Sequence, residues 1–369
     1  MARRVVISGY YGFGNAGDEA ILAGIVAGFR ELAPDVQLVV LSATPQETAA
    51  EHGVECVDRA RFGDIGRAID GADLLISGGG GLLQDVTSWR SPLYYLHVIR
   101  LARKRGKPVM LFAQGIGPLR RRLIRTAVRW TLKDVQAISV RDRQSVEELE
   151  RLRVAGPPVE VTADPAFLIS PASAGRVKDI VKRENLSAAG GRRLLVNVRD
   201  WRGPTASARA RANLITELAS ALDTVAAEEK AEIVFLPMQR GDADLAGNVL
   251  AAMVAPGNVV LGEYSPSEIA ALAATAGVVV AIRLHALMFA VMAGVTPVGI
   301  SYDPKVDAFL GSLDLTPAAQ VGEIDGAGLA AAIRAAMASA ADFRPHLLEA
   351  AGRQRELALE NVRMALALM

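Results

Sequence analysis

The chain has 369 residues, more than a single hydrophobic core usually supports, so we expect two domains. Apolar residues make up 51% and charged residues 22% of the sequence, a composition that excludes a disordered chain and fits an α/β protein. There are 41 Lys and Arg residues and 40 Asp and Glu residues, so the overall charge gives no indication of a nucleic-acid partner.

The sequence has none of the usual signs of export or membrane insertion. The single cysteine, Cys56, excludes an internal disulfide and fits a reducing compartment. The first apolar run breaks at Gly9, which is too early for a signal peptide, and no apolar run approaches the ~20 residues of a membrane span. We therefore expect a cytoplasmic protein.

Short apolar runs alternate with amphipathic segments, which is the pattern of parallel sheets with crossover helices. After the first strand, a helix is predicted with Ile21, Ile25 and Phe29 on one apolar stripe. Another helix is predicted from Ser91, as its cap, to just before Gly106. The strands predicted in the first half are residues 5–10, 36–42, 73–79, 108–115, 137–142 and 159–165.

A second α/β series follows a break in this rhythm. Residues 171–193 are rich in small and polar residues and are predicted to be a linker. A long helix is expected near 206–228, and the last ~25 residues are expected to form a terminal helix. We therefore predict two Rossmann-like domains with parallel sheets facing a cleft, at 1–170 and 194–369. The strands predicted in the second domain are residues 193–200, 232–240, 258–264, 276–283 and 296–302.

Glycine-rich loops follow three strands of the first half, within residues 9–22, 78–85 and 113–118. In an open α/β sheet, ligands bind outside the carboxyl ends of the strands. Glycine lets the main chain approach a ligand closely, and a following helix start offers N–H groups to an anion. Tight turns without a ligand would need the same glycines. None of the loops matches a Walker A or dinucleotide motif.

Two residues of the opening loop have two interpretations. Asn15 and Asp18 could cap the following helix, or Asp18 could accept a proton from a substrate hydroxyl. We leave both interpretations open and expect the neighbouring Glu19 to be solvated.

The segment AIRLHALMFA, residues 281–290, places Arg283 and His285 where a buried strand gives way to a helix. A single histidine is more often structural, but the adjacent arginine and the strand end favour function here. His52 and His97 are expected on helices away from this edge and are interpreted as structural. The next strand ends in SYDPK, residues 301–305.

Arginines of the first half are harder to interpret. Arg141 ends a strand, and Asp142 is predicted to cap the next helix. Arg121, Arg125 and Arg129 share one helical face, which is either solvated or attracted to anionic lipid headgroups or a phosphorylated acceptor. The GDAD segment at 241–244 gives little support for a metal, and we predict no metal site.

Together, the stretches GYYGFGNAGDEAIL, ISGGGGLLQD, AQGIGP, SVRD, ADPAF, RLHALMFA and SYDPKV resemble the polysaccharide pyruvyl transferase family, most closely its CsaB branch. The resemblance covers nearly the whole chain, with the motifs in family order. It implies a GT-B-like architecture and transfer of the enolpyruvyl group of phosphoenolpyruvate to a sugar as a ketal, with release of phosphate. For the CsaB branch it implies a 4,6-ketal on N-acetylmannosamine of a secondary cell-wall polymer that anchors S-layer proteins.

The resemblance also implies roles for individual residues. It makes His285 and Asp18 the catalytic pair, with acid and base interchangeable, and it implicates either Arg141 or Arg125, of which we favour Arg141. Phosphoenolpyruvate is a donor substrate, so no cofactor is expected. The implied acceptor is a glycan with or without a lipid carrier, and with a carrier the enzyme would work at the inner face of the membrane. The predicted substrate-binding residues are Arg283, Leu284, Lys305, Arg141, Arg125, Asn15, Gly79, Gly80 and Gln114.

Two other functions are compatible with the sequence. The segment 281–300 also resembles the donor side of a GT-B glycosyltransferase that uses a nucleotide sugar. A non-catalytic glycan-binding protein would bind the acceptor without turnover. Release of phosphate from phosphoenolpyruvate, without use of a nucleotide sugar, would distinguish a pyruvyl transferase from both alternatives.

Overall fold

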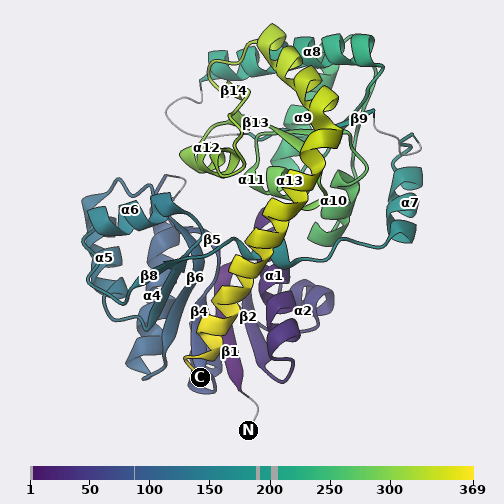
Figure 1. Ribbon diagram of the computed structural model, residues 1–369. Coiled ribbons are helices and arrows are strands. Elements are labelled where there is room, and N and C mark those ends of the chain that lie inside the picture. Colours follow the sequence, from purple (N-terminus) through teal and green to yellow (C-terminus); the bar gives the residue numbers. More distant parts are fainter. Residues whose placement is uncertain (1–2, 87, 188–191, 201–206) are drawn as a thin grey trace. The chain divides into compact units, whose positions relative to one another are not determined.

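The computed structural model describes residues 3–86, 88–187, 192–200 and 207–369, and the chain divides into two compact units (Figure 1). Unit 1 comprises Met1–Ile169 together with Arg353–Met369, and unit 2 comprises Ser170–Gly352. Each unit has its own parallel sheet. The predicted fold class, α/β with two parallel sheets, is therefore confirmed.

The sheet of unit 1 has the order β3-β2-β1-β4-β6-β7-β8, with β5 paired to β6, and all its pairs are parallel. The reversal of strand order at β1 and β4 is typical of a doubly wound fold. The strands are β1 (Arg4–Tyr11), β2 (Gln37–Ser42), β3 (Glu55–Asp58), β4 (Leu74–Ser77), β5 (Gly80–Leu83), β6 (Val109–Ile116), β7 (Ala137–Val140) and β8 (Val159–Val161).

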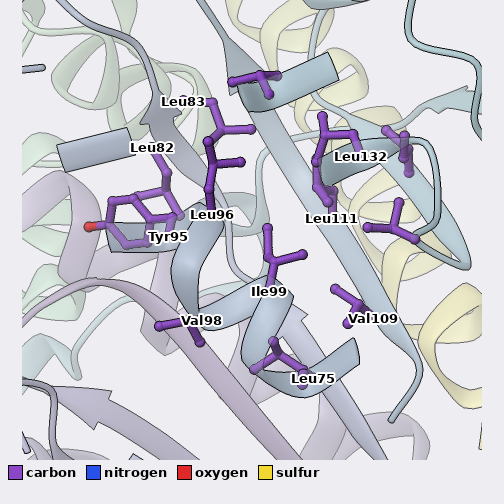
Figure 2. Packing of buried hydrophobic residues seen from close by; sticks show 14 of the residues in the cluster. Leu75, Leu82, Leu83, Tyr95, Leu96, Val98, Ile99, Val109, Leu111 and Leu132 are labelled. Carbon is purple, nitrogen blue, oxygen red and sulfur yellow. The ribbon is translucent and has the colours of Figure 1, made fainter. Parts of the chain in front are cut away.

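Both faces of this sheet are buried because side chains alternate along each strand. Val6 belongs to the core on one face, whereas Val5 and Ile7 belong to the core on the other. On the first face, Leu75 and Leu111 meet Ile99 of α4 in the cluster of Figure 2. The helices of this unit are α1 (Ala16–Leu32), α2 (Pro45–His52), α3 (Phe62–Asp70), α4 (Arg90–Lys104), α5 (Arg122–Leu132), α6 (Arg143–Arg151) and the 3-10 helix η1 (Pro165–Leu168).

Unit 2 repeats the plan with the order β11-β10-β9-β12-β13-β14. Its strands are β9 (Arg193–Asn197), β10 (Glu232–Phe235), β11 (Gly257–Val259), β12 (Val278–Ala281), β13 (Thr296–Ser301) and β14 (Ala319–Gln320). Its helices are α7 (Ala174–Arg183), α8 (Ala208–Glu229), α9 (Arg240–Ala252), α10 (Pro266–Ala273), α11 (Leu284–Met292) and α12 (Pro304–Gly311), and α13 (Gly326–Leu366) begins here.

The predicted domain limits need two corrections. The linker predicted at 171–193 contains α7, which belongs to unit 2, while residues 188–191 lie outside the described part. The terminal helix was expected to belong wholly to the second domain, but α13 has 41 residues and Arg353–Met369 packs in unit 1. There Asn361 bonds to Ser139 and Thr162, at 2.6 and 2.8 Å.

Some elements were missed or misplaced by the sequence pattern. The short strands β3, β5 and β14 were not predicted, and α4 begins at Arg90, with Trp89 rather than Ser91 as its N-cap residue. Within the described ranges, no helix is both long and apolar enough to cross a bilayer.

Candidate active site

The first loop of unit 1 bends sharply after β1. Gly12 has φ +79°, and a Cβ there would lie 2.4 Å from the Ser42 hydroxyl, so this position requires glycine. Asn15 then caps α1, because its Oδ1 accepts from the Gly17 N–H at 3.2 Å. Its Nδ2 donates to Asp18 Oδ2 at 2.5 Å. The capping interpretation of Asn15 is confirmed, and its cap orients the half-buried Asp18.

The Asp18 carboxylate lies against the second glycine-rich loop. Gly80 has φ +92°, and a Cβ there would lie 3.0 Å from Asp18 Oδ1. A Cβ at Gly79 would be 2.9 Å from Ile21, so Gly79 lets this loop pack closely on α1. Both glycines therefore have a packing reason, and Gly80 also leaves space beside the carboxylate.

Glu19 is not solvated as predicted. It is half-buried, and its Oε1 accepts from the Gly12 N–H at 2.9 Å. Burial raises the pKa of this carboxyl to about 7, against the lowering effect of the Gly12 hydrogen bond. A carboxyl with a pKa near neutrality is suited to acid–base chemistry, so Glu19 is a second candidate beside Asp18.

Gln114 is not placed to touch a substrate. Its side chain is fully buried, and its Nε2 donates to Ser77 Oγ at 2.8 Å and to the Gly78 carbonyl at 3.0 Å. The prediction of a substrate contact is therefore corrected: Gln114 ties the end of β6 to the loop after β4.

The two candidate arginines of unit 1 lie in different environments. The Arg141 side chain is 8% exposed and forms an ion pair with Asp164 at 2.5 Å. Burial would lower its pKa, but the carboxylates of Asp164, Asp142 and Asp18 outweigh burial and raise it. Asp142 caps α6 as predicted, accepting from the Ser145 N–H at 2.7 Å. Arg125 is exposed on α5.

Aromatic rings gather beside the opening loop around Arg59, which directly follows β3. The rings of Tyr10 and Phe13 are stacked with centroids 4.2 Å apart, and Phe13 is 43% exposed. The Arg59 guanidinium lies 4.9 Å from the Phe13 ring and 4.3 Å from the Tyr94 ring, and it donates to the Gly9 carbonyl at 3.0 Å. This arrangement holds Phe13 as a fixed, exposed ring.

In unit 2, cationic side chains follow three neighbouring strands, β9, β12 and β13. They are Arg199, Arg283 and Lys305, and the last two lie at the N-termini of α11 and α12. Because parallel strands end at one edge of a sheet, these groups and two helix N-termini share that edge. The edge is suited to an anion.

Arg283 is held by a buried carboxylate. Its Nε and Nη2 donate to the two oxygens of Asp242 at 2.6 and 2.7 Å, and Nη2 also donates to Gln239 at 2.9 Å. Asp242 is 1% exposed and Arg283 8%. Two of the three Arg283 nitrogens are therefore already hydrogen-bonded within the chain, and the contact of Arg283 with a substrate stays a prediction. Nη1 has no hydrogen bond to the described residues.

Tyr302 holds the other two cations. The Arg199 guanidinium lies 4.6 Å from its ring centroid and donates to its hydroxyl, and the Lys305 ammonium lies 5.4 Å from the same centroid. Lys305 Nζ is also 3.3 Å from Asp303 Oδ2, in a pair with 29% and 27% exposed side chains. Two cations thus lie beside one ring at this edge, and neither is held by a buried carboxylate of the described residues.

His285 and Leu284 occupy the first turn of α11. His285 is half-buried at the second helical position, and Leu284 is 8% exposed. Leu284 therefore belongs mainly to the packing that fixes the turn. His52 is buried, and burial and Arg30 lower its pKa to about 4, which fits its structural interpretation.

Sequence reasoning missed Arg199, Asp242, Gln239 and the aromatic cluster. Asp242 lies in GDAD, which was considered only as a metal motif, although its position after β10 placed it at the edge shared with Arg283. Arg199 follows β9 in the same way, so its strand-end position was the available signal.

Comparisons with known proteins place this geometry in context. Solved structures with the same fold include a UDP-GlcNAc 2-epimerase of Neisseria meningitidis bound to UDP-GlcNAc (TM-score 0.65, 9% identity, covering 98% of this chain and 100% of that one). Another is a glycosyltransferase of Rickettsia africae (TM-score 0.61, 10% identity, covering 100% of this chain and 99% of that one). A third is the ADP-heptose heptosyltransferase II of E. coli (TM-score 0.51, 12% identity, covering 91% of this chain and 99% of that one). These neighbours are GT-B epimerases and glycosyltransferases and show the fold alone.

No curated protein matched the chain significantly. The family model of polysaccharide pyruvyl transferase matches residues 15–304, a range that contains Asp18, Arg141, Arg283 and His285. The chain therefore belongs to the polysaccharide pyruvyl transferase family.

Proposed function

We propose that this protein transfers the enolpyruvyl group of phosphoenolpyruvate to two hydroxyls of a sugar, forming a cyclic ketal and releasing phosphate. The observation that carries the proposal is the positive edge of unit 2, where Arg199, Arg283 and Lys305 follow neighbouring strands. Phosphoenolpyruvate carries a carboxylate and a phosphate, so it suits several fixed cations and helix N-termini.

We divide the anion contacts according to how each cation is held. Lys305 and Arg199 are assigned to the phosphate, because both cations lie beside the Tyr302 ring and neither is held by a buried carboxylate in the part of the chain that the structure describes. Arg283 keeps Nη1 for the carboxylate while Asp242 fixes its orientation. Asp242 and Gln239 act as positioning residues.

The chemistry requires a proton donor and a proton acceptor. We assign His285 to protonate the methylene carbon C3, which leaves an oxocarbenium-like centre at C2. A sugar hydroxyl adds to C2, and Asp18 accepts its proton; acid and base can be exchanged between these residues. A second hydroxyl then displaces phosphate from C2, and its proton leaves with the phosphate. Bond changes balance without a redox or metal-dependent step.

We assign the acceptor to unit 1. The exposed Phe13 ring offers a surface for the apolar face of a pyranose, and Asp18 and Glu19 lie in the first turn of α1, just after the loop that carries Phe13. Arg141 is assigned to stabilise the Asp18 carboxylate electrostatically, since the Asp18 charge contributes to the raised pKa of Arg141. By the resemblance to the CsaB branch, we propose N-acetylmannosamine of a cell-wall polymer as acceptor, a 4,6-ketal as product and anchoring of S-layer proteins as its use in a cytoplasmic pathway.

The test is incubation of the protein with phosphoenolpyruvate and acceptors that contain N-acetylmannosamine. We expect the acceptor to gain the mass of one ketal-linked pyruvate, with one phosphate released per ketal. Transfer of a sugar from a nucleotide sugar, without use of phosphoenolpyruvate, would instead support a glycosyltransferase. Acceptor binding with no turnover from either donor would support a glycan-binding protein.

A further inference from the structure

Helix α5 of unit 1 exposes two large apolar side chains among cations. Leu123 is 84% exposed and Trp130 62% exposed, whereas Ile124 and Val128 of the same helix are buried. Single exposed apolar residues are common, so it is their combination with the cations around them that indicates an interaction surface. The α5 face is defined here as Arg122, Leu123, Arg125, Arg129, Trp130 and Lys133.

The spacing places these side chains in two adjacent stripes. Arg122, Arg125, Arg129 and Lys133 recur at intervals of three or four residues, so they form one stripe along the helix. Leu123 and Trp130 are separated by two turns and form a second stripe beside it.

All charged side chains of the α5 face are positive. The sequence from Arg120 to Lys133 contains no acidic residue, and none of its arginines forms an ion pair with a described residue. Asp134, which follows, is paired with Arg103 at 2.8 Å. Lys133 instead lies 4.3 Å from the Trp130 ring. The partner must therefore supply negative charge and accept apolar side chains at the same surface.

We propose that the α5 face docks on the surface of an anionic lipid bilayer. Tryptophan and leucine favour the boundary between headgroups and acyl chains, while arginines bind anionic headgroups. A second copy of the chain fits less well, because a two-fold contact would bring the two arginine stripes together. This inference does not depend on the proposed reaction, since it concerns neither donor nor acceptor.

The experiment is co-sedimentation of the full chain with vesicles of phosphatidylcholine, with and without phosphatidylglycerol. We expect binding to the mixed vesicles only, weakened by salt. Because each arginine near an anionic surface contributes about fivefold in affinity, Arg122→Glu/Arg129→Glu should bind more than about tenfold more weakly. Leu123→Asp should also weaken binding. Addition of mixed vesicles should shift Trp130 fluorescence to the blue, and Trp130→Phe should lose that shift.

A matched control changes the same charge elsewhere. Arg209→Glu/Arg240→Glu reverses two exposed arginines of unit 2 and should bind vesicles like the wild type. Circular dichroism establishes that each variant is folded. Failure of the wild type to bind mixed vesicles would overturn the proposal, as would equal loss in the control. Light scattering that shows a dimer dissociated by Leu123→Asp would assign the face to a second copy instead.

Discussion

The carboxyl edges of the two sheets occupy equivalent places in equivalent folds, yet their side chains have opposite character. The edge of unit 1 has glycine loops, an exposed aromatic ring and acidic groups, of which Glu19 has a pKa raised by burial. The edge of unit 2 has three cations, of which Arg283 is fixed by a buried acid. The fold thus fixes where a site lies, and the loop residues decide whether it suits a neutral sugar or an anion.

The largest effect is expected at His285. His285→Ala should lower the rate of phosphate release by ~10²- to 10⁴-fold, because it removes the assigned proton donor. His97→Ala is the matched control, since His97 is an exposed histidine whose ring lies 5.1 Å from that of Phe62. Near-normal turnover in His285→Ala would remove histidine from the mechanism.

Breaking the buried ion pair of unit 2 should destabilise the protein. Asp242→Asn leaves the Arg283 charge buried without its carboxylate, which should cost about 3–5 kcal/mol of unfolding free energy. The double variant Asp242→Leu/Arg283→Met removes both charges, so it should recover much of the stability but not the binding of phosphoenolpyruvate. Thermal unfolding measures the stability, and titration calorimetry measures the binding of phosphoenolpyruvate. Full donor binding by the double variant would show that this pair is purely structural.

A smaller effect is expected from the exposed cations beside Tyr302. Lys305→Met or Arg199→Met should each weaken binding of phosphoenolpyruvate by roughly 10- to 100-fold, the worth of one charged hydrogen bond. Lys178→Met, on the exposed side of α7, provides the control. Unchanged donor affinity in both site variants would show that the phosphate of phosphoenolpyruvate does not bind at this edge.

Glu19 should make unit 1 less stable as the pH rises. Its pKa is about 7 in the folded chain and near 4.5 when unfolded, so between these values only the unfolded chain loses the proton. Stability is then lost progressively from pH ~4.5 to ~7, by about 3 kcal/mol. Glu19→Gln should be more stable than the wild type at pH 8 and equal at pH 4. The same difference in unfolding free energy between Glu19→Gln and the wild type at pH 4 and at pH 8 would refute the raised pKa of Glu19.

The smallest effect is expected at Phe13. Phe13→Ala should raise the KM for the sugar acceptor about fivefold, because a stacking contact contributes about 1 kcal/mol, and should leave the KM for phosphoenolpyruvate unchanged. Leu261→Ala, which removes an even more solvent-exposed apolar group of unit 2, is the control. An increase in the donor KM alone would place the sugar elsewhere.

Much of the fold followed from the sequence because buried parallel strands leave continuous apolar runs, as in Leu74–Ser77 and Val278–Ala281. The short strand Glu55–Asp58 was missed because it is partly exposed and contains two acidic residues. The return of Arg353–Met369 to unit 1 was missed because helical periodicity shows which face is buried, not which core buries it.

The sequence predicted where the candidate site lies, but not which of its residues bond to one another. Strand ends located Asp18, Arg283 and Lys305 at the sheet edges. Sequence could not show that Asp242, 41 residues before Arg283, uses two of its nitrogens. It could not show that Gln114 is fully buried either, because polar residues at strand ends serve turns as well as ligands.

The most direct test of the difference between the two edges is calorimetric titration of phosphoenolpyruvate into the wild type, Lys305→Met and Asp18→Asn. We expect Lys305→Met to bind the donor weakly, and Asp18→Asn to bind it with nearly wild-type affinity while releasing phosphate more slowly. Loss of donor binding in Asp18→Asn, with full binding in Lys305→Met, would contradict the assignment of the anion to unit 2.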